Sequence, residues 1–244
     1  MSAWTETRVV ELAVPQASGV VSIDDGVFLV VDDDRGIYVA YENGTADVVA
    51  RRKDHPELRD LEGICLGPDG TAWVLSERTS AVHSLSIDKT RSGVELAPPR
   101  LVAALEHIAR KNNKGWEGIE VFGAHAFACH EDKPKRVGVF SLPDLVTVAV
   151  MKLPKSADSA LDDLSDVCID PLSGHLIVLS DESACFAELS LEVDHGVPTA
   201  LALERIVEID VGKKEKPEGV CVDGRGALWL VTDGDPHLRA FERR

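Results

Sequence analysis

Acidic side chains recur at two fixed positions of a motif that the chain repeats five times. Each copy has two short apolar runs separated by a turn, and each closes with a carboxylate. The opening residues are Ser18, Glu62, Glu117, Ser165–Asp166 and Glu218, and the closing acids are Asp33, Glu77, Glu131, Asp181 and Asp233. If each motif is a β-hairpin, its two ends meet. Nine carboxylates, four opening and five closing, then converge on one mouth.

Carboxylates that crowd together repel one another and raise one another's pKa unless a cation neutralises them. Calcium suits such a place because it accepts roughly six to eight oxygen ligands in flexible geometry, whereas magnesium demands a tighter octahedron. We therefore expect calcium as a cofactor. The candidate metal ligands are Glu62, Glu117, Asp166 and Glu218.

The acids also have a structural interpretation. A carboxylate that opens a strand can accept backbone N–H groups from a neighbouring blade and act as a clasp. The closing acids can pair with turn amides or with basic residues. Their alternative role, shared with Ser18, is substrate binding, for which the candidate acids are Glu77, Glu131, Asp181 and Asp233.

Basic residues precede three of the opening glutamates, among them Arg59 before Glu62 and Lys114 before Glu117. A basic rim around an acidic centre suits an anionic ligand bridged to a metal, such as a phosphate ester, carboxylate or lactone. The alternative is that these bases solvate loops and balance the acids.

Two further residues stand beside the expected mouth. His130 precedes Glu131 and is a candidate general base, although a polar residue at a strand end often has no such role. Trp116, just before Glu117, is a candidate for lining the mouth. The sequence contains no GxSxG, HExxH, P-loop or EF-hand motif.

The repeat indicates the fold. Its copies start at 18, 62, 117, 165 and 218, so the steps are 44, 55, 48 and 53 residues. A third apolar run follows each closing acid, and a fourth follows in four copies, over 46–50, 101–105, 146–153 and 206–211. Four antiparallel strands in a period of about 40–50 residues are typical of a propeller blade. The sequence therefore predicts an all-β, five-bladed β-propeller.

The fifth copy lacks a fourth strand, which the segment 9–14 near the N-terminus can supply, so that the ring closes without a free sheet edge. A six-bladed ring is the alternative. Residues 1–244 are expected to form a single domain. Helical spacing predicts short helices within 104–115 and 156–164, and a long polar loop is expected over 88–99.

Composition excludes several classes of protein. A net charge of −16 disfavours nucleic acid, whose binding depends on neutralised phosphates. No apolar run approaches a membrane span, and the first residues do not resemble a signal peptide, so we expect a cytoplasmic protein that does not bind membranes. The five cysteines lack a CxxC pair and are expected to be reduced and buried.

The repeated openings are Asp-Leu-Glu-Gly-Ile (60–64), Trp-Glu-Gly-Ile (116–119), Leu-Ser-Asp-Val (164–167) and Pro-Glu-Gly-Val (217–220). They resemble the SdiA-regulated and esterase-like phytase group of β-propellers over roughly residues 18–241. The resemblance implies a propeller with calcium at its channel.

More distantly, the strand-opening glutamate is similar to the metal-ligand position of gluconolactonase-type propellers, in which Glu, Asn and Asp hold the ion. By position Glu62, Glu117, Asp166 and Glu218 match. The chain departs from that pattern by lacking the Asn, by having Ser18 in the first copy, and by having five copies instead of six.

Two functions from different classes follow. The first is a calcium-dependent hydrolase of an anionic ester or lactone, in which His130 or a neighbouring acid moves the proton. The second is a non-catalytic propeller that binds a ligand or protein at the same face. The expected partner is a small anionic molecule or a protein, and the oligomeric state is not predicted.

Overall fold

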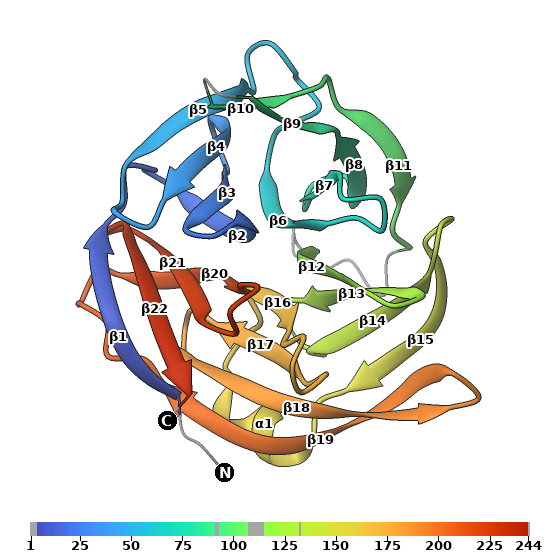
Figure 1. The fold of residues 1–244 in the computed structure, drawn as a ribbon. Helices are drawn as coiled ribbons and strands as arrows, with labels where there is room; N and C mark the ends of the chain where they lie inside the picture. Colours follow the sequence, from blue (N-terminus) through green and yellow to red (C-terminus); the bar gives the residue numbers. More distant parts are fainter. Residues whose placement is uncertain (1–3, 91–92, 107–114, 132, 244) are drawn as a thin grey trace.

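Five four-stranded antiparallel sheets surround a central axis and form a five-bladed β-propeller (Figure 1). The computed structural model describes residues 4–90, 93–106, 115–131 and 133–243. In the first four blades the strands follow one another along the chain from the axis outwards. This architecture confirms the predicted fold class, with five blades instead of six.

The blades divide the chain as the repeat predicts. Blade one contains β2 (Ala17–Asp24), β3 (Val27–Asp32), β4 (Gly36–Tyr41) and β5 (Ala46–Arg51). Blade two contains β6 (Leu61–Leu66), β7 (Ala72–Ser76), β8 (Ala81–Leu85) and β11 (Arg100–Ala104). Blade three contains β12 (Trp116–Phe122), β13 (His125–His130), β14 (Arg136–Ser141) and β15 (Val146–Lys152). Blade four contains β16 (Asp166–Ile169), β17 (Leu176–Ser180), β18 (Cys185–Asp194) and β19 (Val197–Glu208).

Blade five joins the two ends of the chain. Its strands are β20 (Lys216–Val222), β21 (Leu228–Asp233), β22 (His237–Arg243) and the N-terminal β1 (Trp4–Glu11). β1 pairs antiparallel with β22, so the first and last residues of the ring share one sheet. The predicted closure is confirmed, although β1 begins five residues earlier than the expected segment 9–14.

Apolar side chains fill the spaces between neighbouring blades. Phe28 of blade one lies against Trp229 of blade five, with ring centroids 4.8 Å apart. Trp229 and Trp73 occupy the same repeat position, and both are buried. All five cysteines are free and buried, as expected. Because each blade packs only on its two neighbours, the ring places the same end of every blade around the axis.

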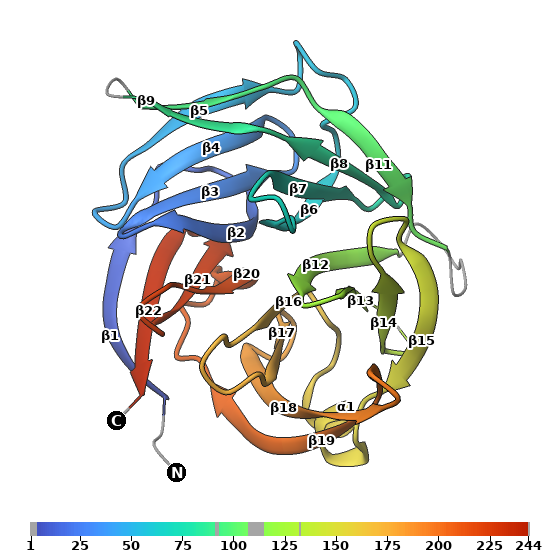
Figure 2. The same cartoon turned by 45° about the vertical axis from the view of Figure 1, so that its right-hand side comes forward.

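Two predictions about outer strands were wrong. Instead of a long polar loop over 88–99, the chain forms a hairpin of β9 (Ile87–Thr90) and β10 (Gly93–Leu96), which lies beside β5 in both views (Figures 1 and 2). Ile87, Val94 and Leu96 pack against the core between blades one and two, which explains why this polar segment is ordered.

The fourth strand of blade four, expected over 206–211, runs instead from residue 197 to residue 208. Its turn consists of His195 (φ 48°) and Gly196 (φ 82°), and two consecutive positive φ angles are typical of a type I′ hairpin. The turn therefore fixes a register that extends β18 and β19 beyond the rest of the blade.

The predicted helix within 156–164 is confirmed as α1 (Lys155–Ala160), which lies between blades three and four along the chain. Of the helix expected within 104–115, residue 104 belongs to β11 and residues 107–114 lie outside the described part. Among the described residues, no helix is long and apolar enough to cross a membrane.

Candidate functional site

The side chains of the candidate site are aimed by β-bulges. In four blades the pairing of the first strand with the second shifts register where the motif opens, and the residues in the shift include Ser18, Glu62, Glu117 and Glu218. A bulge turns a side chain away from the regular alternation of a strand. Blade four lacks the shift, since Asp166 pairs regularly with Leu179.

The glycines after these residues let the first strands approach one another. A Cβ on Gly63 would lie 2.8 Å from the Glu117 carbonyl oxygen, and one on Gly118 would lie 2.2 Å from Asp166 Oδ1. Neither place accepts a side chain without movement of the neighbouring strand. The motif therefore needs glycine because first strands meet backbone to backbone at the axis.

We call the carboxylates at this end of the channel the acidic mouth; it consists of Asp33, Asp60, Glu62, Glu77, Glu117, Glu131 and Glu218. Backbone hydrogen bonds tie its segments together across the first junction. The Asp60 N–H donates to the Asp33 carbonyl oxygen (3.2 Å), and the Glu77 N–H donates to the Asp60 carbonyl oxygen (3.0 Å). The backbone that carries Asp33, Asp60 and Glu77 is therefore held in place by hydrogen bonds.

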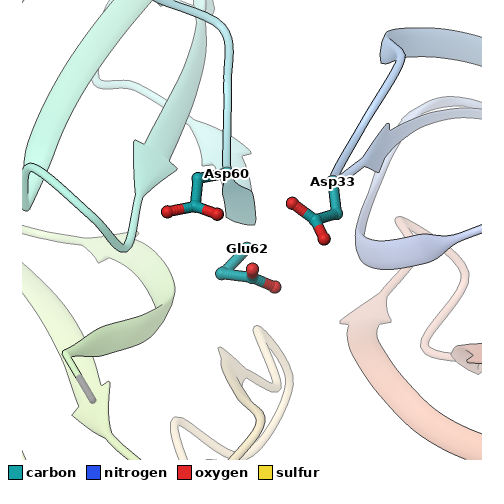
Figure 3. A group of neighbouring side chains, drawn as sticks. All are labelled: Asp33, Asp60 and Glu62. Atoms are coloured by element: carbon teal, nitrogen blue, oxygen red, sulfur yellow. The ribbon is translucent and has the colours of Figure 1, made fainter. Parts of the chain in front are cut away.

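The first three-carboxylate group, Asp33, Asp60 and Glu62, lies between blades one and two. Each residue offers an oxygen within 4.8 Å of the others, and the three side chains border one space (Figure 3). Two oxygens on a calcium ion with bonds of about 2.4 Å lie at most about 4.8 Å apart. The group therefore has the spacing of a calcium site.

The carboxylates of this first group differ in their hydrogen-bond and ion-pair partners. Asp60 pairs with the exposed Arg78, with Nε 3.0 Å from Oδ2. In the described part of the chain, Glu62 has neither a hydrogen bond nor an ion pair to its carboxylate. A recessed carboxylate without a partner is costly in the ionised state.

The second group, Glu77, Glu117 and Glu131, lies between blades two and three and meets the same distance criterion. Gly115 takes the place here that Asp60 has in the first group, two residues before the opening glutamate. Its N–H donates to the Glu77 carboxylate. The acid Glu131, which closes the motif of blade three, supplies the third carboxylate instead.

Burial and mutual repulsion raise the pKa of the mouth carboxylates. The pKa of Glu62 is raised well above its usual value, by burial first and then by Asp33 and Glu218. The pKa of Glu117 is also raised well above its usual value, by burial first and then by Glu62. Burial followed by Asp60 raises the pKa of Glu77 to about 7. Because these carboxylates repel one another, a cation bound at the mouth would reduce the repulsion among several of them at once.

The junction between blades four and five contains its own cation. Lys216 stands two residues before Glu218, which is the repeat position of Asp60, and its Nζ lies 2.9 Å from Asp181 Oδ2. Burial raises the pKa of Glu218 to about 8, with Asp181 adding to the shift and Lys216 opposing it. Where the first junction has a third acid, this junction has an ammonium group.

Asp166, a candidate metal ligand, acts as a clasp. Its Oδ1 accepts the Val167 N–H (2.7 Å) and its Oδ2 accepts the Val220 N–H of blade five (2.8 Å). The residue occupies the repeat position of the glycines, one place after the opening glutamates. Because side chains alternate along a strand, that offset points it between blades and away from both three-carboxylate groups.

The other sequence-predicted residues divide between mouth and core. Trp116 is 1% exposed and packs edge-on against His130, with centroids 5.7 Å apart, so neither side chain lines the surface of the mouth. Ser18 is buried at the opening of blade one, and Arg59 is exposed. Asp233 acts on Glu218 from the end of β21. Lys114 lies outside the described residues.

Two acids of this end were missed in the sequence. Asp60 completes the first group, and Asp163 accepts hydrogen bonds from the Ser180 hydroxyl and the Glu182 N–H. Both stand two residues before the opening position of a blade. Residues two apart lie on one side of an extended segment, and this periodicity could have identified them.

Comparison with known proteins identifies a family and agrees with the propeller fold. Residues 6–238 match the model of the family described as SdiA-regulated. Among solved structures, the calcium structure of a family AA12 carbohydrate-active enzyme from Trichoderma reesei has a TM-score of 0.62 at 10% identity, covering 100% of this chain and 97% of that one.

Two other propellers are similar. The PQQ-bound aldose sugar dehydrogenase from Streptomyces coelicolor has a TM-score of 0.61 at 13% identity, covering 100% of this chain and 99% of that one. A candidate gluconolactonase has a TM-score of 0.58 at 13% identity, covering 97% and 92%. At these identities the likeness shows the propeller fold alone.

Proposed function

The chain belongs to the SdiA-regulated family, and from its acidic mouth we propose that it binds a divalent cation, calcium, through Asp33, Asp60 and Glu62. The second group, Glu77, Glu117 and Glu131, is a further calcium site of the same kind. This assignment keeps Glu62 and Glu117 as ligands but in separate groups, and it gives Asp166 a structural role.

The observation that carries the proposal is the contrast between two equivalent junctions. Lys216 neutralises Asp181 between blades four and five, while Asp60 adds a negative charge at the same repeat position between blades one and two. Backbone and bulge are alike at both places. The first junction therefore lacks a cation at this repeat position. Arg78, which pairs with Asp60, is exposed, and calcium would neutralise the carboxylates between the blades.

The proposed reaction is hydrolysis of a small anionic ester or lactone held over the mouth. Bound calcium would polarise the substrate oxygen. Glu218 lies outside both three-carboxylate groups, and in the calcium-free protein its pKa is raised to about 8, so it is suited to hold or move a proton near neutral pH. The charge of Glu218 raises the pKa of both Glu62 and Glu117, which supports a position of Glu218 close to the proposed metal.

A non-catalytic binding module is the second candidate. The burial of His130 against Trp116 favours it, because this removes the imidazole from the mouth and leaves carboxylates as its acid–base groups. Such a module would hold a small anionic molecule or a protein at the mouth without turnover.

The test is calcium titration by calorimetry into chelator-treated protein. The parent is expected to bind two calcium ions in the micromolar range. In Glu62→Gln the site of Asp33 and Asp60 should bind at least tenfold more weakly, while the Glu77–Glu117–Glu131 site keeps its ion. Glu192→Gln, which removes an exposed charge on β18, is the control and should bind as the parent does. No calcium heat in the parent, or equal binding by Glu62→Gln, would reject the metal site. Turnover of ester or lactone substrates then separates the enzyme from the binding module.

A further inference from the structure

A cavity of about 650 Å³ lies in blade one and the connection to blade two. Its charged lining residues are five cations and one acid. The cations are Arg35, Arg51, Arg52, Lys53 and Arg59, and the acid is Asp34. We call it the basic cavity.

The basic cavity stands out against the charge of the whole chain. The protein has a net charge of −16, yet the charged lining groups sum to +4, five cations less one acid. Arg52 Nη1 pairs with Asp34 Oδ1 at 2.8 Å. Within the described residues, the other four cations form no ion pair within 4.0 Å. Cations that could have paired with the many surface acids are instead gathered together, where they repel one another.

The walls of the cavity strengthen its attraction for an anion. Tyr38 is only 5% exposed, and it lines the cavity together with Val48 and Pro56. An apolar wall lowers the local dielectric constant, so a charge-assisted hydrogen bond near it is stronger than in open water. Guanidinium groups present paired N–H donors that match the oxygens of phosphate and carboxylate.

The cavity and the first carboxylate group share the same two backbone segments. Asp34 and Arg35 directly follow Asp33, and Arg59 directly precedes Asp60. The charge of Arg52 acts on the Asp33 carboxylate. The lining of the basic cavity is therefore one residue along the backbone from two of the proposed calcium ligands, Asp33 and Asp60.

We infer that the basic cavity is an anchoring subsite for an oxyanion group that carries at least two negative charges, such as a phosphate, on a small molecule whose other end reaches the Asp33–Asp60–Glu62 group. As a statement about the substrate this rests on the proposed function. The cavity itself contains none of the mouth carboxylates, so anion binding and calcium binding can be tested separately.

The probe is inorganic phosphate, titrated by calorimetry into chelator-treated full-length protein at low salt. The variants are Arg51→Gln, Arg59→Gln and their combination. Each removes one charge-assisted contact and is expected to weaken phosphate binding roughly tenfold, and the double variant more. Arg100→Gln on β11, an exposed arginine outside the cavity, is the matched control and should bind phosphate as the parent does.

The outcomes are distinct from those of the calcium experiment. The proposal expects Glu62→Gln to lose calcium at the Asp33–Asp60–Glu62 group but keep phosphate binding. Arg51→Gln should keep calcium binding and bind phosphate roughly tenfold more weakly. Phosphate binding should weaken steeply as sodium chloride is raised. Absence of phosphate binding in the millimolar range, or equal weakening by Arg100→Gln and Arg51→Gln, overturns the subsite even if calcium binds.

Discussion

Replacement of Glu218 by Gln should stabilise the calcium-free protein, and increasingly so as the pH rises. The pKa of this carboxyl is raised from 4.5 to about 8, by burial first and then by Asp181, against the opposing charge of Lys216. In the unfolded chain the group ionises near its usual pKa. Between these values the folded protein binds the extra proton, so stability falls as the pH rises through that window. Gln mimics the protonated acid and removes the penalty.

The magnitude follows from the displaced pKa. One pKa unit corresponds to about 1.4 kcal/mol, so the penalty of Glu218 grows from roughly 1 kcal/mol at pH 5 to roughly 3 kcal/mol at pH 7. The gain from Glu218→Gln should therefore increase by about 2 kcal/mol over this range. The pKa shift of Asp181 has the opposite sign. Its hydrogen bonds with Asp163 and Lys216 outweigh its burial and lower its pKa. The stability that Asp181 contributes is lost only below about pH 4, outside the range from pH 5 to pH 7.

The assay is urea denaturation at pH 5, 6 and 7 in the presence of a chelator. Glu192→Gln on β18 makes the same chemical change at an exposed place and should differ from the parent by a constant amount. If Glu218→Gln and the parent lose equal stability between pH 5 and pH 7, the pKa of Glu218 is not raised as argued. Calcium at about 100 times its dissociation constant should restore roughly 2.7 kcal/mol to the parent at pH 7.

Two other changes test the junctions. Lys216→Asp replaces the ammonium group 2.9 Å from Asp181 by a third acid, and calorimetry should find one additional calcium per chain; an unchanged stoichiometry would contradict the comparison of junctions. Gly63→Ala places a Cβ 2.8 Å from the Glu117 carbonyl oxygen and should cost about 1–3 kcal/mol in urea denaturation. Gly224→Ala has no atom within 4 Å of its new Cβ and should change stability by less than about 0.5 kcal/mol, so equal effects of the two would refute the close approach.

The repeat made the fold predictable to the level of blade order and ring closure. The two apolar runs of each motif also predicted the inner strands, because both faces of these strands are buried by neighbouring blades. The outer strands escaped prediction where local chemistry decides the register. The His195–Gly196 turn, with two positive φ angles, extends β19, and Ile87 and Leu96 order a hairpin in a segment that is polar as a whole.

The candidate site was predictable in part. The position of Glu62 and Glu117 at one mouth follows from the repeat, and the structure brings each together with two further carboxylates. Distances across junctions could not follow, because they depend on how neighbouring blades pack on one another, which the repeat does not specify. The role of Asp166 depends on a one-residue offset within its motif, and the burial of Trp116 depends on how blade two packs on blade three.

The repeat position two residues before each opening residue accounts for the differences among junctions. In blade order it holds Gln16, Asp60, Gly115, Asp163 and Lys216. These five positions are equivalent in the ring, so their backbone roles are similar. Their side chains differ in charge: two are neutral, two are negative and one is positive. Asp60 adds to an acidic group and Lys216 neutralises one. A symmetric scaffold therefore carries an asymmetric electrostatic field. Charge at the mouth is set by the residues that depart from the repeat. The basic cavity includes Arg59, the neighbour of Asp60, at one of the two junctions where this position is acidic.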